Sequence, residues 1–178
     1  MSGDHRGAAL TTRRRLLDSF NSLVLRGAEG KITVSDIVRE AGVGRSTFYD
    51  HYSSAHDIHQ QALAGPMTLL AESILGLQTE ERLSFLLRHF WENRERARRT
   101  LSGEEGEQVE QLLVSILESR LPKGAGSNPK SRKVAAIELA VVPLALIRAW
   151  LEGTVQCSGT EMAQHMSEAS AAMRKELL

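Results

Sequence analysis

The sequence is poor in aromatic residues and has a single cysteine. Tryptophan, tyrosine and phenylalanine together make up 4% of its 178 residues, and Cys157 has no second thiol with which to pair. An internal disulfide framework is therefore excluded. The net charge is zero at pH 7, so the chain as a whole has no electrostatic attraction to nucleic acid or to a membrane surface. Any basic surface must be local.

Long hydrophobic runs and enzyme motifs are missing as well. The longest strictly apolar run, Leu139 to Ile147, has nine residues, whereas a membrane span needs about 20. The N-terminal stretch lacks the apolar core of a secretory signal. The sequence contains no Gly-rich phosphate loop, no nucleophile elbow and no H-E-x-x-H motif. We expect a cytoplasmic protein without membrane association, catalytic residues or a cofactor.

Hydrophobic spacing predicts an all-α fold. From Thr11 onward, apolar residues recur at helical intervals, as in Leu16, Phe20 and Leu23, and no alternating strand pattern is found. Residues 1–12 have few large apolar groups and are predicted to form a mobile arm. Gly65-Pro66 is expected to kink or break one helix, and residues 122–129 are predicted to form a loop. The other predicted helices cover residues 34–41, 45–52, 54–77, 79–95, 109–121, 130–153 and 159–177.

The segment from Thr33 to Tyr52, TVSDIVREAGVGRSTFYDHY, has the pattern of a helix-turn-helix motif. Thr33 and Asp36 form a capping-box pair at the start of the first helix. Gly42-Val43-Gly44 then separates two short helices, as this motif requires. In proteins with this motif the second helix lies in the major groove of DNA, so the segment predicts DNA binding.

Residues of the second helix divide into two faces. Phe48 and Tyr52 are four positions apart, and we expect their shared face to be buried. On the outward face, Arg45 can donate two hydrogen bonds to guanine, and Tyr49 can touch a thymine methyl group. Asp50 is unfavourable near phosphates unless it accepts from cytosine or pairs with Arg45. The candidate DNA contacts are Arg45, Ser46, Thr47, Tyr49, Asp50 and His51, together with Arg13 and Arg14 from the basic run before them, for which a solvated helix start is an equal alternative.

The segment ITVSDIVREAGVGRSTFYDHYSSAHDI resembles the DNA-binding head of the TetR family of bacterial repressors. The resemblance covers about residues 11–60 and implies DNA contacts at positions 33, 45, 46, 47, 49 and 51, which adds Thr33. It also implies a helical body that dimerises through its last two helices and often encloses a small-molecule pocket. Ala55 stands where many members carry a lysine, so one phosphate contact of the family is lost.

We therefore expect a DNA-binding domain at residues 1–53 and a helical effector and dimerisation domain at residues 54–178. Large side chains of the body are candidates for an effector pocket, with an ordinary bundle core as the alternative: Met67, Phe85, His89, Phe90, Trp91 and Trp150. Apolar side chains of the last two predicted helices are candidates for the dimer interface: Val142, Leu146, Trp150, Met162, Met166 and Met173.

The resulting hypothesis is a TetR-like transcriptional regulator. It would act as a repressor that binds a palindromic DNA operator as a homodimer and is released by a small-molecule effector. The alternative from another class is a helical protein-interaction module with no role in DNA binding. A third possibility is an all-α enzyme that uses His89 and nearby glutamates. No metal site is expected, because no carboxylate or cysteine cluster completes a ligand set with His51, His56 and His59.

Overall fold

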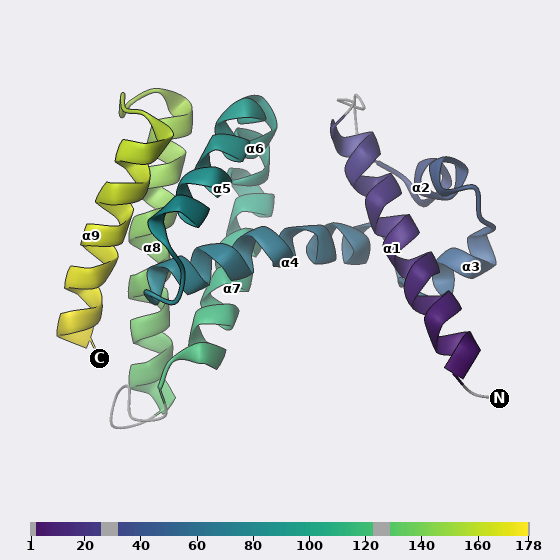
Figure 1. The fold of residues 1–178 in the computed structure, drawn as a ribbon, viewed down its shortest axis with the longest axis horizontal. Helices are drawn as coiled ribbons and strands as arrows, with labels where there is room; N and C mark the ends of the chain where they lie inside the picture. Colours follow the sequence, from purple (N-terminus) through teal and green to yellow (C-terminus); the bar gives the residue numbers. More distant parts are fainter. Residues whose placement is uncertain (1–2, 26–31, 123–128, 178) are drawn as a thin grey trace. The chain divides into compact units, whose positions relative to one another are not determined.

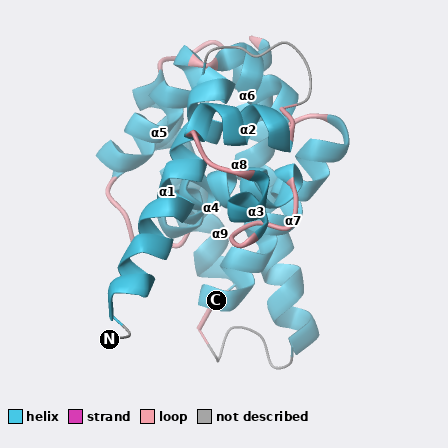
Figure 2. Cartoon of the chain, turned by 90° about the vertical axis from the view of Figure 1, so that its right-hand side faces the viewer, coloured by secondary structure: helices cyan, strands magenta, loops and turns pink. Residues whose placement is uncertain are grey.

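The computed structural model describes residues 3–25, 32–122 and 129–177, and these residues form nine α-helices (Figure 1). Figure 2 shows the described chain as helices and loops without a strand, which confirms the predicted all-α class. The helices are α1 (Gly3–Leu25), α2 (Val34–Ala41), α3 (Arg45–Tyr49), α4 (Ala55–Ile74), α5 (Glu80–Glu92), α6 (Arg94–Thr100), α7 (Gly103–Arg120), α8 (Pro129–Glu152) and α9 (Gly159–Leu177).

The chain divides into two compact units, Met1–Ala64 and Gly65–Leu178, which we call the head and the body. The boundary falls inside α4, so that one helix contributes residues to both units. In the head, α1 packs on α2, and α2 packs on α3. The buried residues of the head form one apolar cluster, which comprises Leu16, Phe20, Ile37, Ala41, Phe48, Tyr52 and Ile58.

The body is a bundle in which α5 lies beside α9, and α8 lies between α7 and α9 (Figure 1). The short helix α6 packs against α7 and α8. Buried apolar residues from all the long body helices fill the centre, among them Leu70, Leu87, Leu113, Leu139, Ile147 and Met166. This arrangement confirms the predicted helix-turn-helix head followed by a helical body.

Two of the predicted helix ends are wrong. Of the residues predicted to be a mobile arm, those from Gly3 onward belong to α1, and the first two lie outside the described residues. Ala8, Ala9 and Leu10 are strong helix formers, so the helix continues although it has few large apolar groups to bury. The predicted end of α3 at Tyr52 is also wrong, because α3 ends at Tyr49. Just after it the His51 amide donates to the Phe48 carbonyl, three residues back, at 3.0 Å, as in a tight turn.

Two further predictions concern helix continuity. The break predicted at Gly65-Pro66 is absent, because α4 runs from Ala55 to Ile74 through Pro66, and a proline removes only one backbone donor. The kink expected there stays a prediction. Conversely, the helix predicted for residues 79–95 ends at Glu92. Asn93 has a non-helical backbone (φ −110°, ψ 34°), and its side-chain amide donates to the His89 carbonyl at 2.9 Å. The basic run after it forms the separate helix α6. Most of the predicted loop at 122–129 lies outside the described residues.

Candidate nucleic-acid interface

The first helix of the motif, α2, begins with a complete capping box. The Asp36 amide donates to the Thr33 hydroxyl at 3.3 Å, and the Thr33 amide donates to the Asp36 carboxylate at 3.0 Å. The Thr33 hydroxyl also donates to that carboxylate, at 2.6 Å, and this bond is the largest cause of the lowered pKa of Asp36. Both donors of Thr33 are therefore directed at Asp36, which leaves Thr33 without a free donor for a DNA phosphate while the box is intact.

The end of α2 is a Schellman motif. Gly42 adopts the left-handed conformation (φ 61°, ψ 39°), which glycine reaches without steric penalty. The Gly42 amide donates to the Arg39 carbonyl at 3.3 Å, and the Val43 amide donates to the Val38 carbonyl at 3.1 Å. Val43 and Val38 both pack against the core of the head. The turn is therefore fixed by backbone bonds and by apolar contact.

The second helix, α3, has five residues and depends on its neighbours for stability. Its N-cap, Gly44, makes no side-chain hydrogen bond, and Phe48 is the one residue of α3 that is buried. The Phe48 ring is completely buried and lies 5.7 Å from the ring of Tyr52, which is also buried. These two aromatic residues anchor α3 to the head core.

The opposite side of α3 is open to solvent. Arg45, Ser46, Tyr49 and Asp50 are exposed, and Tyr49 keeps 58% of its surface. We call these four residues the exposed face. Arg45 donates to the Ser35 hydroxyl on α2 at 2.5 Å. Among the described residues of the head, Arg45 forms no hydrogen bond with Asp50. The remaining guanidinium donors of Arg45 stay available for a base edge.

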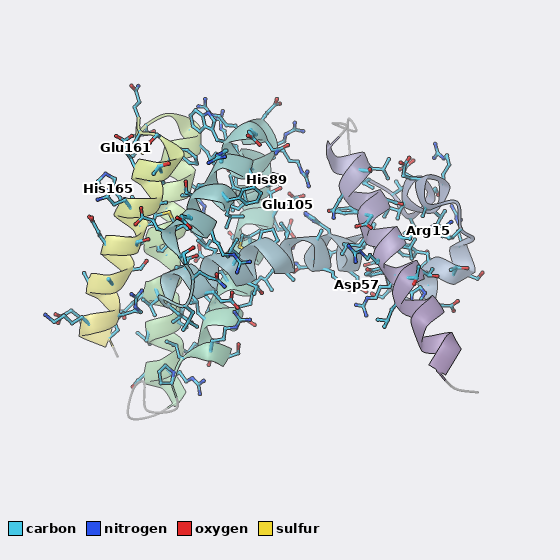
Figure 3. All side chains as sticks on the ribbon, in the orientation of Figure 1. Arg15, Asp57, His89, Glu105, Glu161 and His165 are labelled. Carbon is cyan, nitrogen blue, oxygen red and sulfur yellow. The ribbon has the colours of Figure 1, made fainter. Side chains whose placement is uncertain are left out.

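Thr47 and His51, which are neighbours of these residues in the sequence, are half-buried. The fourth helix begins at Ala55. The Asp57 carboxylate accepts from the Ser53 amide at 2.9 Å, and the Asp57 amide donates to the Ser54 hydroxyl at 3.1 Å (Figure 3). Ala55, the first residue of α4, offers no cationic side chain to a phosphate.

The three consecutive arginines in the middle of α1 have different surroundings. Arg13 donates to the Gln61 side chain at 2.7 and 3.2 Å, and its guanidinium lies 5.3 Å from the centre of the Tyr52 ring. Arg14 projects into solvent with 85% of its side chain exposed, beside Asp18 at 3.9 Å. Arg15 donates to backbone carbonyls at the end of α2. Among the described residues of the head, Arg14 is thus the predicted contact that no other helix engages. The sequence analysis did not predict the contact of Arg15 with the end of α2.

In the body, two candidate effector residues form an aromatic pair. The rings of Trp91 and Trp150 lie 4.7 Å apart, and the Arg94 guanidinium sits 4.7 Å from the Trp91 ring. Arg94 also donates to the Leu151 carbonyl at 2.5 Å, and the Trp150 indole donates to the Cys157 carbonyl at 2.9 Å. These contacts join α5, α6 and α8 at one end of the bundle.

The other candidate effector residues are dispersed. Met67 is buried in the body core, and Phe90 is half-buried. Phe85 keeps 68% of its surface, and His89 is exposed as well. These two residues of α5 therefore face solvent in the described chain. In the described residues there is also no group of three or more histidine, cysteine, aspartate or glutamate side chains placed to hold a metal ion.

The candidate dimer residues divide in the same way. Trp150, Met162 and Met166 are buried within the body itself, whereas Val142 is exposed and Leu146 and Met173 are half-buried. The exposed apolar residues of α8 form a stripe that was not predicted as a set, namely Val134, Ile137, Val141 and Val142. The segment Ser131–Glu152 has the length and hydropathy of a membrane span, and half of its most apolar window is buried against the described bundle.

Comparison with solved structures identifies the fold as that of the TetR transcriptional regulators. A TetR regulator from Streptococcus agalactiae 2603V aligns over 96% of this chain and 99% of its own, with a TM-score of 0.57 and 20% identity. The TetR family repressor AlkX from Dietzia sp. strain DQ12-45-1b, implicated in biodegradation of n-alkanes, aligns over 92% and 98%, with a TM-score of 0.57 and 17% identity.

A third structure with this fold is the dihydroxyacetone kinase operon activator DhaS, which aligns over 94% of this chain and 98% of its own, at 17% identity and a TM-score of 0.55. A scan against protein-family models and a search of curated proteins find no match. The likeness is therefore one of fold, and it extends over both the head and the body.

Proposed function

We propose that this protein is a DNA-binding transcriptional regulator. The observation that carries the proposal is that α3 has one buried side and one exposed side. Phe48 is fully buried, whereas Arg45, Ser46 and Tyr49 are exposed. A helix anchored in this way presents a guanidinium, a hydroxyl and a phenol together, which suits hydrogen bonding to base edges and phosphates. The TetR fold of the chain supports the same reading.

The protein would bind a palindromic operator as a homodimer. A two-fold dimer presents two copies of α3 to successive major grooves, about 34–36 Å apart. The exposed stripe on α8 supports dimerisation, because Val134, Ile137 and Val141 recur at helical spacing on one side of an otherwise packed helix. A protein of this kind works on chromosomal DNA, so we place it in the cytoplasm and assign it no catalytic activity.

Within this proposal the protein is a repressor that a small molecule releases from DNA. An effector can do so only if it binds one conformation of the dimer more tightly than the other. The aromatic pair Trp91 and Trp150 is the best candidate for the effector region, because the Arg94 cation lies against it. Both tryptophans of the chain are in this pair, so intrinsic fluorescence offers a direct readout of ligand binding.

Selection from a randomised duplex library tests the DNA-binding proposal. We expect the protein to enrich a palindromic sequence, with an affinity that falls steeply as salt rises. Tyr49→Phe should weaken binding to the enriched duplex by about 1 kcal/mol, the net value of one hydrogen bond, at unchanged thermal stability. Failure to enrich any sequence would instead favour the alternative of a helical protein-interaction module.

A further inference from the structure

The direction of α3 cannot be set by α3 alone. A five-residue helix is too short to be stable in isolation, and the N-cap of this one makes no side-chain hydrogen bond. The buried rings of Phe48 and Tyr52 anchor the C-terminal side of the helix to the head core. The N-terminal side of the helix follows directly from the turn at Gly42 to Gly44, so the position of that turn helps to set the direction of α3.

Arg15 supplies a contact at that point from α1. Its Nε donates to the Ala41 carbonyl at 2.8 Å, and its Nη2 donates to the carbonyls of Ala41 and Gly42 at 2.5 and 3.1 Å (Figure 3). Carbonyls at the end of a helix have no partner within the helix and carry its negative dipole end, so a cation is favoured there. The next residue, Leu16, is completely buried, which holds this part of α1 in place.

The contact is shaped for a guanidinium. Two nitrogens of one planar group reach two successive carbonyls, which a lysine ammonium on a flexible stem cannot reproduce in the same geometry. The group also lies close over the glycine, because a Cβ added to Gly42 would be 3.4 Å from the Arg15 Nη2. The left-handed glycine and the arginine therefore fit together as one unit.

We propose that Arg15 is a positioning residue for DNA recognition. It holds the turn to α1 and so fixes the direction in which α3 presents Arg45 and Tyr49, without contacting DNA itself. The inference rests on the proposed function, and it assigns to Arg15 a role that differs from phosphate binding by the neighbouring exposed arginine, Arg14.

The test compares binding to two duplexes: one enriched by the wild-type protein from a randomised library, and a scrambled duplex of the same length. Arg15→Ala should lose about ten-fold in affinity for the enriched duplex, the equivalent of roughly 1.4 kcal/mol for hydrogen bonds to a charged group. Affinity for the scrambled duplex should change much less. The ratio of the two affinities should therefore fall, while the salt dependence stays the same, because no phosphate contact is lost.

Two further variants separate the explanations. Arg15→Lys keeps the charge but not the planar fork, so it should remain impaired in the affinity ratio. Arg99→Ala removes one exposed arginine of the body, which pairs with Glu95, and should behave as the wild type. Amide hydrogen exchange of the DNA-free protein should be faster at residues 42–44 in Arg15→Ala, and unchanged in the core of the head around Phe48.

Four results would overturn the inference. A salt slope that falls by about 0.9 in Arg15→Ala would show a direct phosphate contact. Equal losses for both duplexes would show a general effect on folding, and full rescue by lysine would show a general effect of charge. Unchanged affinity for both duplexes would show that the turn holds without Arg15. If the wild-type protein enriches no sequence at all, the proposed function fails and this inference fails with it, which distinguishes that outcome from the other four.

Discussion

Replacing Gly42 by alanine should destabilise the head, whereas the same replacement at Gly65 should stabilise α4. Gly42 ends α2 at φ 61°, in the left-handed region, and an added Cβ would lie 3.4 Å from the Arg15 guanidinium. Gly65 lies inside α4 without a positive φ, and an added Cβ there would meet no atom within 4 Å apart from the backbone of its own helix and its chain neighbours, one of which is Pro66. The two positions are a matched pair, because the chemical change is identical and the backbone differs.

The expected magnitudes have opposite signs. A left-handed conformation costs an L-amino acid about 1–2 kcal/mol, and alanine recovers about 0.4–1 kcal/mol by restricting the unfolded chain. The net loss at Gly42 is then about 0.5–1 kcal/mol. At Gly65 alanine should gain at most about 0.5 kcal/mol, because its better helix propensity is partly offset by crowding between the added Cβ and the ring of Pro66. The two variants should thus differ by about 0.5–1.5 kcal/mol.

Native-state amide hydrogen exchange measures each effect where it arises, since the head and the body are separate units. Peptides that cover residues 34–41 should lose protection in Gly42→Ala, and peptides that cover residues 55–74 should gain protection in Gly65→Ala. Full protection of α2 in Gly42→Ala would refute the reasoning, because it would mean that the left-handed cap contributes nothing. A loss of protection in Gly65→Ala would show that the space around Gly65 does not accommodate a methyl group.

Three further predictions concern other parts of the chain. Val141→Glu places a charge in the exposed stripe of α8 and should shift the protein to monomers in sedimentation, whereas Gln111→Glu on α7 should not. Gly106→Ala should destabilise the body by about 1–3 kcal/mol in urea, followed by tryptophan fluorescence, because the added Cβ would lie 2.5 Å from the Leu101 carbonyl; equal midpoints would contradict this. The pKa of Asp36 is lowered in the folded head, so the ionised carboxylate stabilises the folded head above about pH 4, and this stabilisation is lost as the pH falls further. Asp36→Asn should remove this part of the acid sensitivity in a pH titration followed by circular dichroism.

Helical periodicity and capping chemistry were sufficient to predict α2 and the buried and exposed sides of α3, but not the start of α1 or the end of α3. Thr33 with Asp36 marked the start of α2, and the glycines marked its end, because both signals are local in the sequence. The spacing of Phe48 and Tyr52 predicted their burial, and that of Tyr49 predicted its exposure. These features depend on residues a few positions apart, which is the range over which a helix repeats.

Tertiary partners could not be predicted in the same way. Arg13 and Arg15 are identical side chains two positions apart, yet one contacts Gln61 and the other contacts the carbonyl of Ala41. Those partners are 48 and 26 residues distant in the chain. No local pattern distinguishes them, so a basic run that looks uniform divides into different structural roles.

The body shows a second limit. Helical periodicity predicted that Trp150, Met162 and Met166 are buried. It could not predict whether they are buried by their own subunit or by a partner subunit. In the structure the same subunit buries all three. The apolar stripe on α8 becomes visible only after this packing is known, because the sequence of α8 is hydrophobic on nearly every side.

The shortness of α3 has a consequence for how this protein can change. One residue of the helix, Phe48, carries its packing, and Arg45, Ser46 and Tyr49 are exposed. Exposed positions away from special backbone features generally tolerate substitution within about 0.5 kcal/mol. On the proposed function, substitutions at two or three exposed positions of α3 can therefore change the preferred DNA sequence without destabilising the fold. Gene duplicates of this protein can then acquire new DNA targets without compensating mutations elsewhere.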